Sequence, residues 1–294
     1  MTSLSNKVVA ITGAGSGIGR ALALQAAAEG AALALSDIDE AGLAETAKLC
    51  GASAQVRTDR IDVSDREAVE AWAASVVDEF GRVNIIVNNA GVSLSSNIRD
   101  MSYEDFEWLM GINFWGVVYG TKAFLPAVIG SGDGHVVNIS SLFGLLAVPS
   151  QSAYNAAKFG VRGFTEALRM EMIIDKLPVG VTCVHPGGIK TNIARNGRGD
   201  EFHDAQEVAD FFDEELAITS PEDAAAAIWT AVRRNRPRVL VGTDAKILDK
   251  LVRLVGSGYQ RVAARVSQRR VTDTRSPKYL GTRSTPETAQ QVSS

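Results

Sequence analysis

The stretch Val8-Val9-Ala10-Ile11-Thr12-Gly13-Ala14-Gly15-Ser16-Gly17-Ile18-Gly19 decides the fold of this chain. Its apolar start predicts a β-strand, and residues 20–29 continue as a helical pattern that ends at Gly30. Glycines at such a junction permit a tight turn, and the helix N-terminus offers N–H groups and partial positive charge to a pyrophosphate. The stretch therefore predicts a dinucleotide-binding turn whose contacts come from Gly13, Gly15, Ser16, Gly17, Ile18 and Gly19.

The spacing of these glycines is Gly-x-x-x-Gly-x-Gly, which departs from the generic Gly-x-Gly-x-x-Gly form. The alternative interpretation is therefore a glycine-rich turn without a ligand. Four glycines at one strand–helix junction cost backbone entropy, and this cost favours the binding turn.

Short β-rich runs alternate with helical patterns along the rest of the chain. We expect strands at 8–11, 32–36, 54–58, 84–87, 135–139, 179–184 and 238–242, and helices at 20–29, 65–80, 102–128, 152–176 and 221–234. Several strands are continuous apolar runs, as expected where helices cover both faces of a parallel sheet. The pattern predicts an α/β fold with one doubly wound, parallel, seven-stranded sheet.

We expect a single domain over residues 1–245, followed by a basic C-terminal helix and polar tail over residues 246–294. Residues 187–218 contain no convincing strand. In the C-terminal region, apolar residues mingle with Lys and Arg. That mixture fits a helix packed on its own domain, or an amphipathic helix at a membrane surface or partner groove.

The composition limits the classes of function. An apolar fraction of 46% is typical of a globular protein, and a net charge of −4 gives no reason to expect nucleic acid as a partner. Only two cysteines are present, and no Cys/His cluster suggests a metal site. We expect neither a signal peptide nor a membrane-spanning run, and a cytoplasmic location.

Asp37 closes the second expected strand, eighteen residues after Gly19. A carboxylate at this place can accept hydrogen bonds from an adenosine ribose and would repel a 2′-phosphate. It is followed by Ile38 rather than arginine, although Arg20 comes directly after the turn. The position favours NAD over NADP. Two alternatives stay open, since Asp37 could cap the next helix and Asp39 could be the ribose ligand.

Tyr154 and Lys158 form a Tyr-x-x-x-Lys pair, and Ser141 stands thirteen positions before the tyrosine. In a helix, a spacing of four puts the phenol and the ammonium on one face. A nearby cation is expected to lower the pKa of the phenol and suit it to proton exchange with an alcohol or carbonyl. Ser141 can donate a hydrogen bond to the substrate oxygen. Its competitor is Ser140.

Several short motifs occur in one order: residues 12–19, Asp62-Val63, Asn88-Asn89-Ala90-Gly91, Asn113, Ser141, Tyr154 with Lys158, and Pro186-Gly187 followed by Thr191. Together they resemble the short-chain dehydrogenase/reductase family over residues 7 to about 243. The thirteen-residue spacing from Ser141 to Tyr154 matches the family pattern. The resemblance implies a Rossmann-type sheet and nicotinamide-dependent oxidation of alcohols or reduction of ketones.

The resemblance also implies roles for residues whose spacing alone says little. Asp62 and Val63 would hold the adenine. Asn113 would hold a water that links Lys158 to solvent. The remaining cofactor contacts implied are Asn89, Ala90, Gly91, Pro186, Gly187, Ile189 and Thr191, of which the last two would meet the nicotinamide carboxamide.

The substrate side is mostly apolar, which suggests a hydrophobic alcohol or ketone. Its expected members are Ser93, Leu94, Ser141, Leu142, Phe143, Val148, Tyr154 and a lid over residues 192–217, in which Gly197 and Gly199 would allow movement. Two other functions remain as alternatives: an NADPH-dependent carbonyl or 3-oxoacyl reductase, and a non-catalytic cofactor-binding scaffold.

A homo-dimer or homo-tetramer is expected, since helices 102–128 and 152–176 build interfaces in similar proteins. Their bulky residues are Phe106, Trp108, Phe114, Trp115, Phe159 and Phe164, and the alternative is that these pack in the core. The partners expected are therefore a small alcohol or ketone and a second copy of the chain, with weak surface contact by the basic C-terminal helix as an option.

Overall fold

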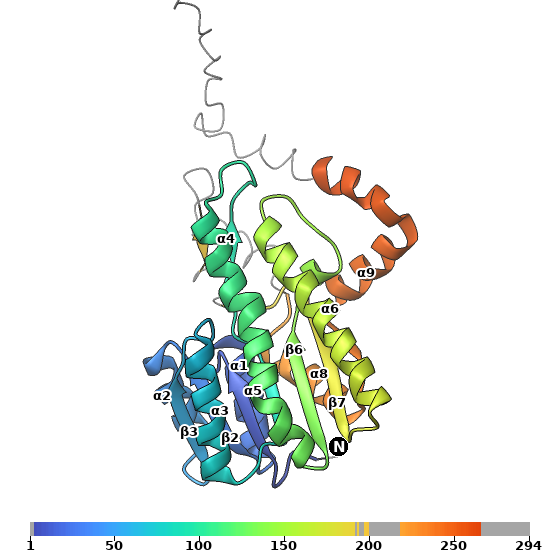
Figure 1. Cartoon of the computed structure of the whole chain (residues 1–294). Helices are drawn as coiled ribbons and strands as arrows, with labels where there is room; N and C mark the ends of the chain where they lie inside the picture. Colours follow the sequence, from blue (N-terminus) through green and yellow to red (C-terminus); the bar gives the residue numbers. More distant parts are fainter. Residues whose placement is uncertain (1–2, 192, 194–196, 200–217, 266–294) are drawn as a thin grey trace, which may run out of the picture.

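The computed structural model describes residues 3–191, 193, 197–199 and 218–265. A central sheet of seven parallel strands has the order β3-β2-β1-β4-β6-β7-β9 (Figure 1). The strands are β1 Val8–Thr12, β2 Ala32–Asp37, β3 Val56–Arg60, β4 Ile85–Asn88, β6 Gly134–Ile139, β7 Val179–Pro186 and β9 Arg238–Val241. The predicted α/β class and the single doubly wound sheet are confirmed.

Helices cover both faces of the sheet, which explains why most strands are apolar throughout (Figure 1). One face packs against α1 (Gly17–Ala28), α2 (Glu40–Leu49) and α8 (Pro221–Arg233), with Trp229 of α8 fully buried. The other face packs against α3 (Arg66–Phe80), α5 (Gly116–Gly130) and α6 (Ser152–Ile174). The two hydrophobic cores hold the strand ends in fixed positions.

The strand order reverses beside β1, because β1 pairs with β2 on one side and with β4 on the other. Ala10, in the middle of β1, is in register with Ala34 of β2 and Ile86 of β4. In open parallel sheets, ligands bind at the carboxyl ends of the strands where this reversal occurs. The glycine turn follows β1 at that place.

Three local features differ from the expectations. The helix α2 was not predicted. The expected helix 102–128 is divided into α4 (Tyr103–Met110), a π-helical turn η1 (Gly111–Trp115) and α5. A two-residue strand β8 (Arg198–Gly199) pairs with β5 (Leu94–Ser95), although no strand was expected in residues 187–218.

The run Tyr103–Gly130 is long and apolar enough, by length and composition alone, to cross a membrane, but one such helix is weak evidence of a membrane span. Its packing gives another explanation for the apolar sequence. Val117, Phe124 and Val128 of α5 are buried, and Phe124 meets Trp72 of α3 edge to face. A helix that covers a sheet passes the same compositional test.

After β9 the chain continues as α9 (Thr243–Val255), a 3-10 turn over Gly256–Gly258 and a helical segment to residue 265. The expected boundary after residue 245 falls inside α9. Part of this segment packs on the domain, where Ala245, Val252 and Tyr259 join a cluster with Leu142 and Leu146. Figure 1 shows α9, in orange, on the upper right of the molecule.

Candidate active site

The glycine turn brings β1, β4 and α1 into close approach. Gly13 has φ +66°, and a Cβ there would lie 2.7 Å from Ala90 Cα. A Cβ on Gly19 would lie 2.1 Å from the carbonyl oxygen of Gly13. Side chains at these two positions would push the turn away from β4. The turn, with Ser16 at the N-cap of α1, therefore presents the helix N-terminus at the end of the sheet, as predicted.

Thr12 fixes the position of the segment after β4. Its Oγ1 accepts the N–H groups of Asn89 (3.0 Å) and Ala90 (3.1 Å), while the Asn89 amide donates to the carbonyls of Thr12 and Gly13. A Cβ on Gly91 would lie 3.6 Å from Lys158 Nζ. The segment 89–91 thus lies between the glycine turn and Lys158.

Asp37 lies beside the turn, as predicted. Its Oδ2 accepts the N–H of Gly15 at 2.8 Å and its Oδ1 accepts the N–H of Asp39 at 3.1 Å. Ile38 is exposed at the rim, next to the carboxylate. Asp39 is the N-cap residue of α2, but its side chain makes no capping hydrogen bond. Asp37 is therefore the carboxylate at the turn itself.

The two residues expected at the adenine follow β3. Asp62 Oδ1 accepts hydrogen bonds from the N–H and hydroxyl of Ser64. Val63 is buried, and a Cβ on Gly116 would lie 2.8 Å from its Cγ2. The loop of Asp62 and Val63 is therefore held against the start of α5.

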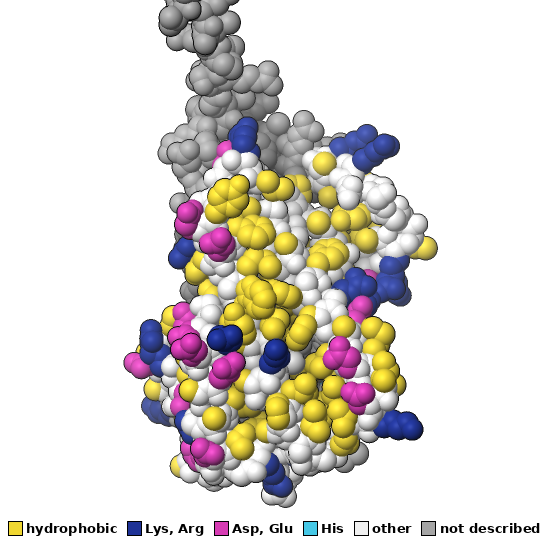
Figure 2. Space-filling model, in the orientation of Figure 1, with side chains coloured by type: hydrophobic (Ala, Val, Ile, Leu, Met, Phe, Trp, Pro, Cys, Tyr) yellow, Lys and Arg dark blue, Asp and Glu magenta, His cyan; other side chains and the backbone are white. Residues whose placement is uncertain are grey.

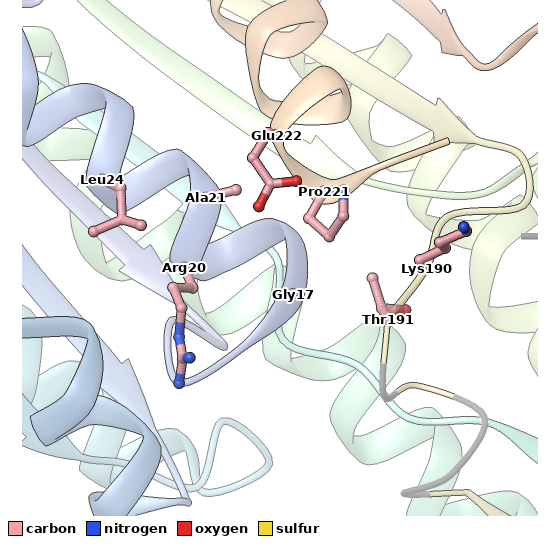
Figure 3. A pocket seen from close by; sticks show the side chains of 8 residues that line it. All are labelled: Gly17, Arg20, Ala21, Leu24, Lys190, Thr191, Pro221 and Glu222. Carbon is pink, nitrogen blue, oxygen red and sulfur yellow. The ribbon is translucent and has the colours of Figure 1, made fainter. Parts of the chain in front are cut away.

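The segment after β7 returns to the glycine turn. A Cβ on Gly17 would lie 3.1 Å from Thr191 Cγ2, so the two approach closely. They line a cavity of about 230 Å³ between α1 and α8, together with Lys190, Pro221 and Glu222 (Figure 3). Figure 3 shows Thr191 across from the turn at Gly17.

The rest of this segment is also fixed. Ile189 is buried and bridges to Thr219, and Pro186 ends β7. Gly187 approaches the carboxylate of Asp244, whose Oδ2 accepts the N–H of Gly188 at 2.8 Å. The structure therefore brings all the predicted cofactor contacts after β7 to the carboxyl end of the sheet.

Ser141, Tyr154 and Lys158 meet at this same end. Ser141 follows β6, and its side chain hydrogen-bonds the phenol of Tyr154 on α6. Lys158 Nζ lies 5.5 Å from the centroid of the Tyr154 ring and donates to the carbonyl of Ile139 at 3.0 Å. Ser140 instead donates to the carbonyl of Lys158, so it anchors β6 to α6. Ser141 is thus the serine that faces the tyrosine.

The expected lowering of the tyrosine pKa was wrong for the chain alone. Burial raises the pKa of Tyr154 to about 12, and the hydrogen bond from Ser141 offsets only part of that rise. Burial also lowers the pKa of Lys158 to about 8. Removal from water is the largest cause of the pKa shift of each group. The tyrosine is therefore a neutral phenol at neutral pH, and the lysine is still mostly charged.

Asn113 lies in the π-helical turn η1 and is fully buried. Its Oδ1 accepts the N–H of Val92 at 2.8 Å, and its Nδ2 donates to the carbonyl of Val92 at 2.8 Å. This pairing fixes the loop after Gly91. A π-turn changes the backbone hydrogen-bond register, which is frequent at functional sites.

The expected substrate residues divide into two groups. Leu94 and Leu142 are buried in hydrophobic clusters, whereas Phe143, Val148 and Tyr154 are only partly buried. The Phe143 ring meets the Tyr154 ring edge to face, with centroids 6.2 Å apart. Ser93 Oγ donates to the carbonyl of Ile193. The predicted lid 192–217 lies outside the described residues except for residues 193 and 197–199.

Two supporting residues were missed in the sequence. Thr12 was not singled out. His185 was not assigned to the site, and its Nδ1 donates to the carbonyl of Ser141 at 2.8 Å. Burial lowers the pKa of His185 to about 4, so the ring is neutral and keeps one N–H. Both contacts join residues far apart in the sequence; the position of Thr12 at the end of β1 is the one signal that could have indicated it.

Comparisons with known proteins agree with this geometry. The sequence model of the short chain dehydrogenase family matches residues 7–201. SadH of Mycobacterium tuberculosis, named as an oxidoreductase, is 58% identical over 90% of this chain and 96% of its own length. The oxidoreductase YxnA of Bacillus subtilis is 34% identical over 92% of this chain and 73% of its own length.

Solved structures give the same result. A short-chain dehydrogenase/reductase from Burkholderia phymatum, in complex with NAD, superposes with a TM-score of 0.81 at 31% identity, over 88% of this chain and 97% of its own. Levodione reductase superposes with a TM-score of 0.73 at 29% identity, over 84% of this chain and 99% of its own. Both likenesses cover more than four fifths of this chain.

Proposed function

Because the chain belongs to the short-chain dehydrogenase/reductase family, whose members are oxidoreductases, we propose that it transfers a hydride between NAD(H) and a hydrophobic secondary alcohol or ketone. The observation that carries this proposal is the meeting of Ser141, Tyr154 and Lys158 at the carboxyl end of the sheet, beside the glycine turn. A non-catalytic scaffold would not need this set of residues.

The residues present fit NAD. Gly13 and Gly17 let the turn pack closely on Ala90 and Thr191, which holds the N-terminus of α1 at the end of the sheet, where a pyrophosphate could bind. Asp37 has its carboxylate beside the turn, where a ribose could donate to it and a 2′-phosphate would be repelled. When bound, NAD would supply the hydride acceptor of the reaction.

Arg20, the first cation after the turn, does not supply a phosphate site. Its side chain donates to Thr46 and to the carbonyl of Gly15, and it pairs with Glu45 at 2.7 Å. These contacts hold the guanidinium against oxygen atoms of the protein itself. The engagement of Arg20 supports NAD over NADP.

The chain's own residues handle the proton. As a neutral phenol, Tyr154 can give its proton to the oxygen of a ketone, and as a phenolate it can take the hydroxyl proton of an alcohol. Ser141 donates a hydrogen bond to the same oxygen and holds it against the phenol. Lys158 places positive charge beneath the tyrosine ring, which stabilises a phenolate as it forms. Asn113 holds the loop that carries Gly91 against the lysine.

The substrate side favours an apolar molecule. Phe143 is partly buried beside Tyr154, and it shares a hydrophobic cluster with the partly buried Val148. A small polar diol would leave these side chains in contact with water, whereas a hydrophobic alcohol would cover them.

A screen of hydrophobic and small polar alcohols and ketones, read by NADH absorbance with NAD and NADP in parallel, tests the proposal. We expect turnover of apolar secondary alcohols or ketones with NAD. Tyr154→Phe should lower kcat by roughly 10²- to 10⁴-fold, because the phenol is the proton carrier. Its affinity for NADH should stay near that of the native protein. Near-normal turnover by Tyr154→Phe would remove the tyrosine from its role, and a clear preference for NADP would support the NADPH-dependent reductase.

A further inference from the structure

The helix α9 carries three parallel stripes of side chains, each with the spacing i, i+4, i+7 of one helix face. The inner stripe is Ala245, Asp249 and Val252. The second stripe is Lys246, Lys250 and Arg253, and the third is Ile247, Leu251 and Leu254. We propose that α9 is a docking surface for an anionic lipid bilayer, in which the third stripe enters the apolar region and the second meets the head groups.

The inner stripe fixes which faces of the helix point outward. Ala245 is fully buried, and Val252 packs on the cluster around Leu142. Tyr259, just after α9, accepts the N–H of Ala147 at 2.9 Å through its hydroxyl. These contacts attach the helix to the loop that follows Ser141. The second and third stripes are therefore held away from the domain.

The third stripe is apolar and exposed to a degree that folding does not explain. Leu254 is 85% exposed and Ile247 is 65% exposed, and Leu251 lies between them, also exposed. Leu248 and Val255 extend the apolar surface along the adjoining face. In a soluble helix these positions are normally polar, because each exposed apolar side chain costs free energy.

The distribution of charged residues along the chain indicates which kind of partner binds this surface of α9. Residues 243–294 contain ten Lys or Arg and four Asp or Glu, whereas residues 1–242 contain twenty Lys or Arg and thirty Asp or Glu. The two acids of α9 are engaged within the protein: Asp244 accepts the N–H of Gly188, and Asp249 pairs with Arg253. The outward charge of the helix is thus cationic, beside an acidic domain. Such segregation suits an anionic surface.

A bilayer uses both stripes at once. Apolar side chains enter the interface, while Lys and Arg extend their stems along it and keep their charged ends at the phosphates. A nucleic acid would use the cations and leave Ile247, Leu251 and Leu254 in water. Figure 2 shows yellow and dark-blue side chains next to one another at the end of the molecule where α9 lies.

Sedimentation of the full-length protein with vesicles tests the proposal. The vesicles are phosphatidylcholine alone, or phosphatidylcholine with a minority of phosphatidylglycerol, at low and high salt. We expect binding to the anionic vesicles that weakens at high salt, and little binding to phosphatidylcholine alone. Lys246→Gln with Lys250→Gln should lower the partition coefficient roughly tenfold or more, since each cation contributes on the order of 1 kcal/mol at such a surface.

Leu251→Gln with Leu254→Gln should also abolish most of the binding, while the matched pair Leu49→Gln with Ile174→Gln should not. The control pair removes two exposed apolar side chains from α2 and α6. The readout does not require turnover, so it is independent of the proposed reaction. The proposal would be overturned if the protein did not bind vesicles, or if it bound both lipid mixtures equally. It would also be overturned if the Leu251/Leu254 pair and the control pair lost vesicle binding to the same extent. Dissociation of an oligomer by Leu251→Gln with Leu254→Gln would overturn it too, since this result would assign the face to a second copy.

Discussion

The carboxylate of Asp37 accepts the N–H of Gly15 in the glycine turn, and we propose that it also binds the adenosine ribose. Replacing Asp37 by Ala and Ile38 by Arg should therefore remove the repulsion of a 2′-phosphate and add a cation for it. We expect the ratio of kcat/KM for NADPH over NADH to rise roughly ten- to hundredfold, as for gain of a charge-assisted hydrogen bond of about 1.5–3 kcal/mol. Asp39→Ala is the control, and a shift in preference in that variant would instead make Asp39 the ribose ligand.

Lys158 should make the stability of the protein depend on pH in an unusual direction. Its pKa is about 8 in the folded protein against 10.5 for an ordinary lysine, so between these values the unfolded chain binds more protons. The free energy of unfolding contributed by this residue therefore rises with pH in that window, because the folded lysine is already neutral. The opposite effect of Tyr154, whose folded pKa is about 12, begins only near pH 10.

Urea unfolding from about pH 7.5 to about pH 9.5 checks this prediction. The stability of native protein relative to Lys158→Met should increase by roughly 2 kcal/mol over that range. Lys122→Met, which removes an exposed lysine from α5, controls for loss of one positive charge. A constant difference between native protein and Lys158→Met would show that the lysine keeps its ordinary pKa in the folded state.

The residues of the candidate site were predictable to the extent that their side-chain chemistry appears in short motifs. Tyr154 and Lys158 share one helix, and Ser141 ends the strand before it. The contribution of His185 was not predictable, because its partner is a backbone carbonyl 44 positions away. The raised pKa of Tyr154 was not predictable either, since it depends on burial that spacing does not show.

Among elements, the close approach of α5 to β4 depends on a missing side chain. A Cβ on Gly120 would lie 2.1 Å from Asn88 Oδ1, in a network where Asn88 also donates to Thr121 and Asn138. Gly120→Ala should lower the free energy of unfolding by about 1–3 kcal/mol, because the helix must move away from the strand. Thermal or urea unfolding measures this change.

Gly130→Ala is the matched control in the same helix. A Cβ at Gly130 meets nothing within 4 Å, so this change should be neutral or slightly stabilising through helix propensity. Equal destabilisation by the two substitutions would mean that helix-end effects, rather than contact with β4, account for the result at Gly120.

The sequence predicted helices and strands correctly where burial of one or both faces gives the apolar residues a regular spacing. All seven strands of the main sheet were expected, with β3 displaced by two residues. The helix α2 was missed because it buries only Gly42, Leu43 and Thr46, too few for a clear apolar period. The strand β8 was missed because a distant contact holds it: Arg198 stacks on the Trp108 ring at 3.9 Å and pairs with Asp105.

In the whole molecule, the aromatic residues of α4, η1 and α6 fall into two groups, one packed in the core and one exposed at the surface. Phe106, Trp108 and Phe114 pack in the cluster around Leu94 and Leu109, so for these the core alternative was right. Trp115 and Phe159 instead remain 46% and 40% exposed. Figure 2 shows a band of yellow side chains over α5 and α6. Association of two copies would remove this band from water.

We predict that the protein is a homo-dimer or homo-tetramer through α5 and α6. Phe159→Arg should convert it to a monomer, because a guanidinium in the middle of the apolar band would be buried without a partner. Light scattering after size-exclusion chromatography measures the mass. Leu254→Arg is the matched control, since it places the same side chain on the exposed stripe of α9 and should leave the mass unchanged. If the native protein elutes as a monomer, or if Leu254→Arg dissociates it as fully as Phe159→Arg, the band over α5 and α6 is not the interface.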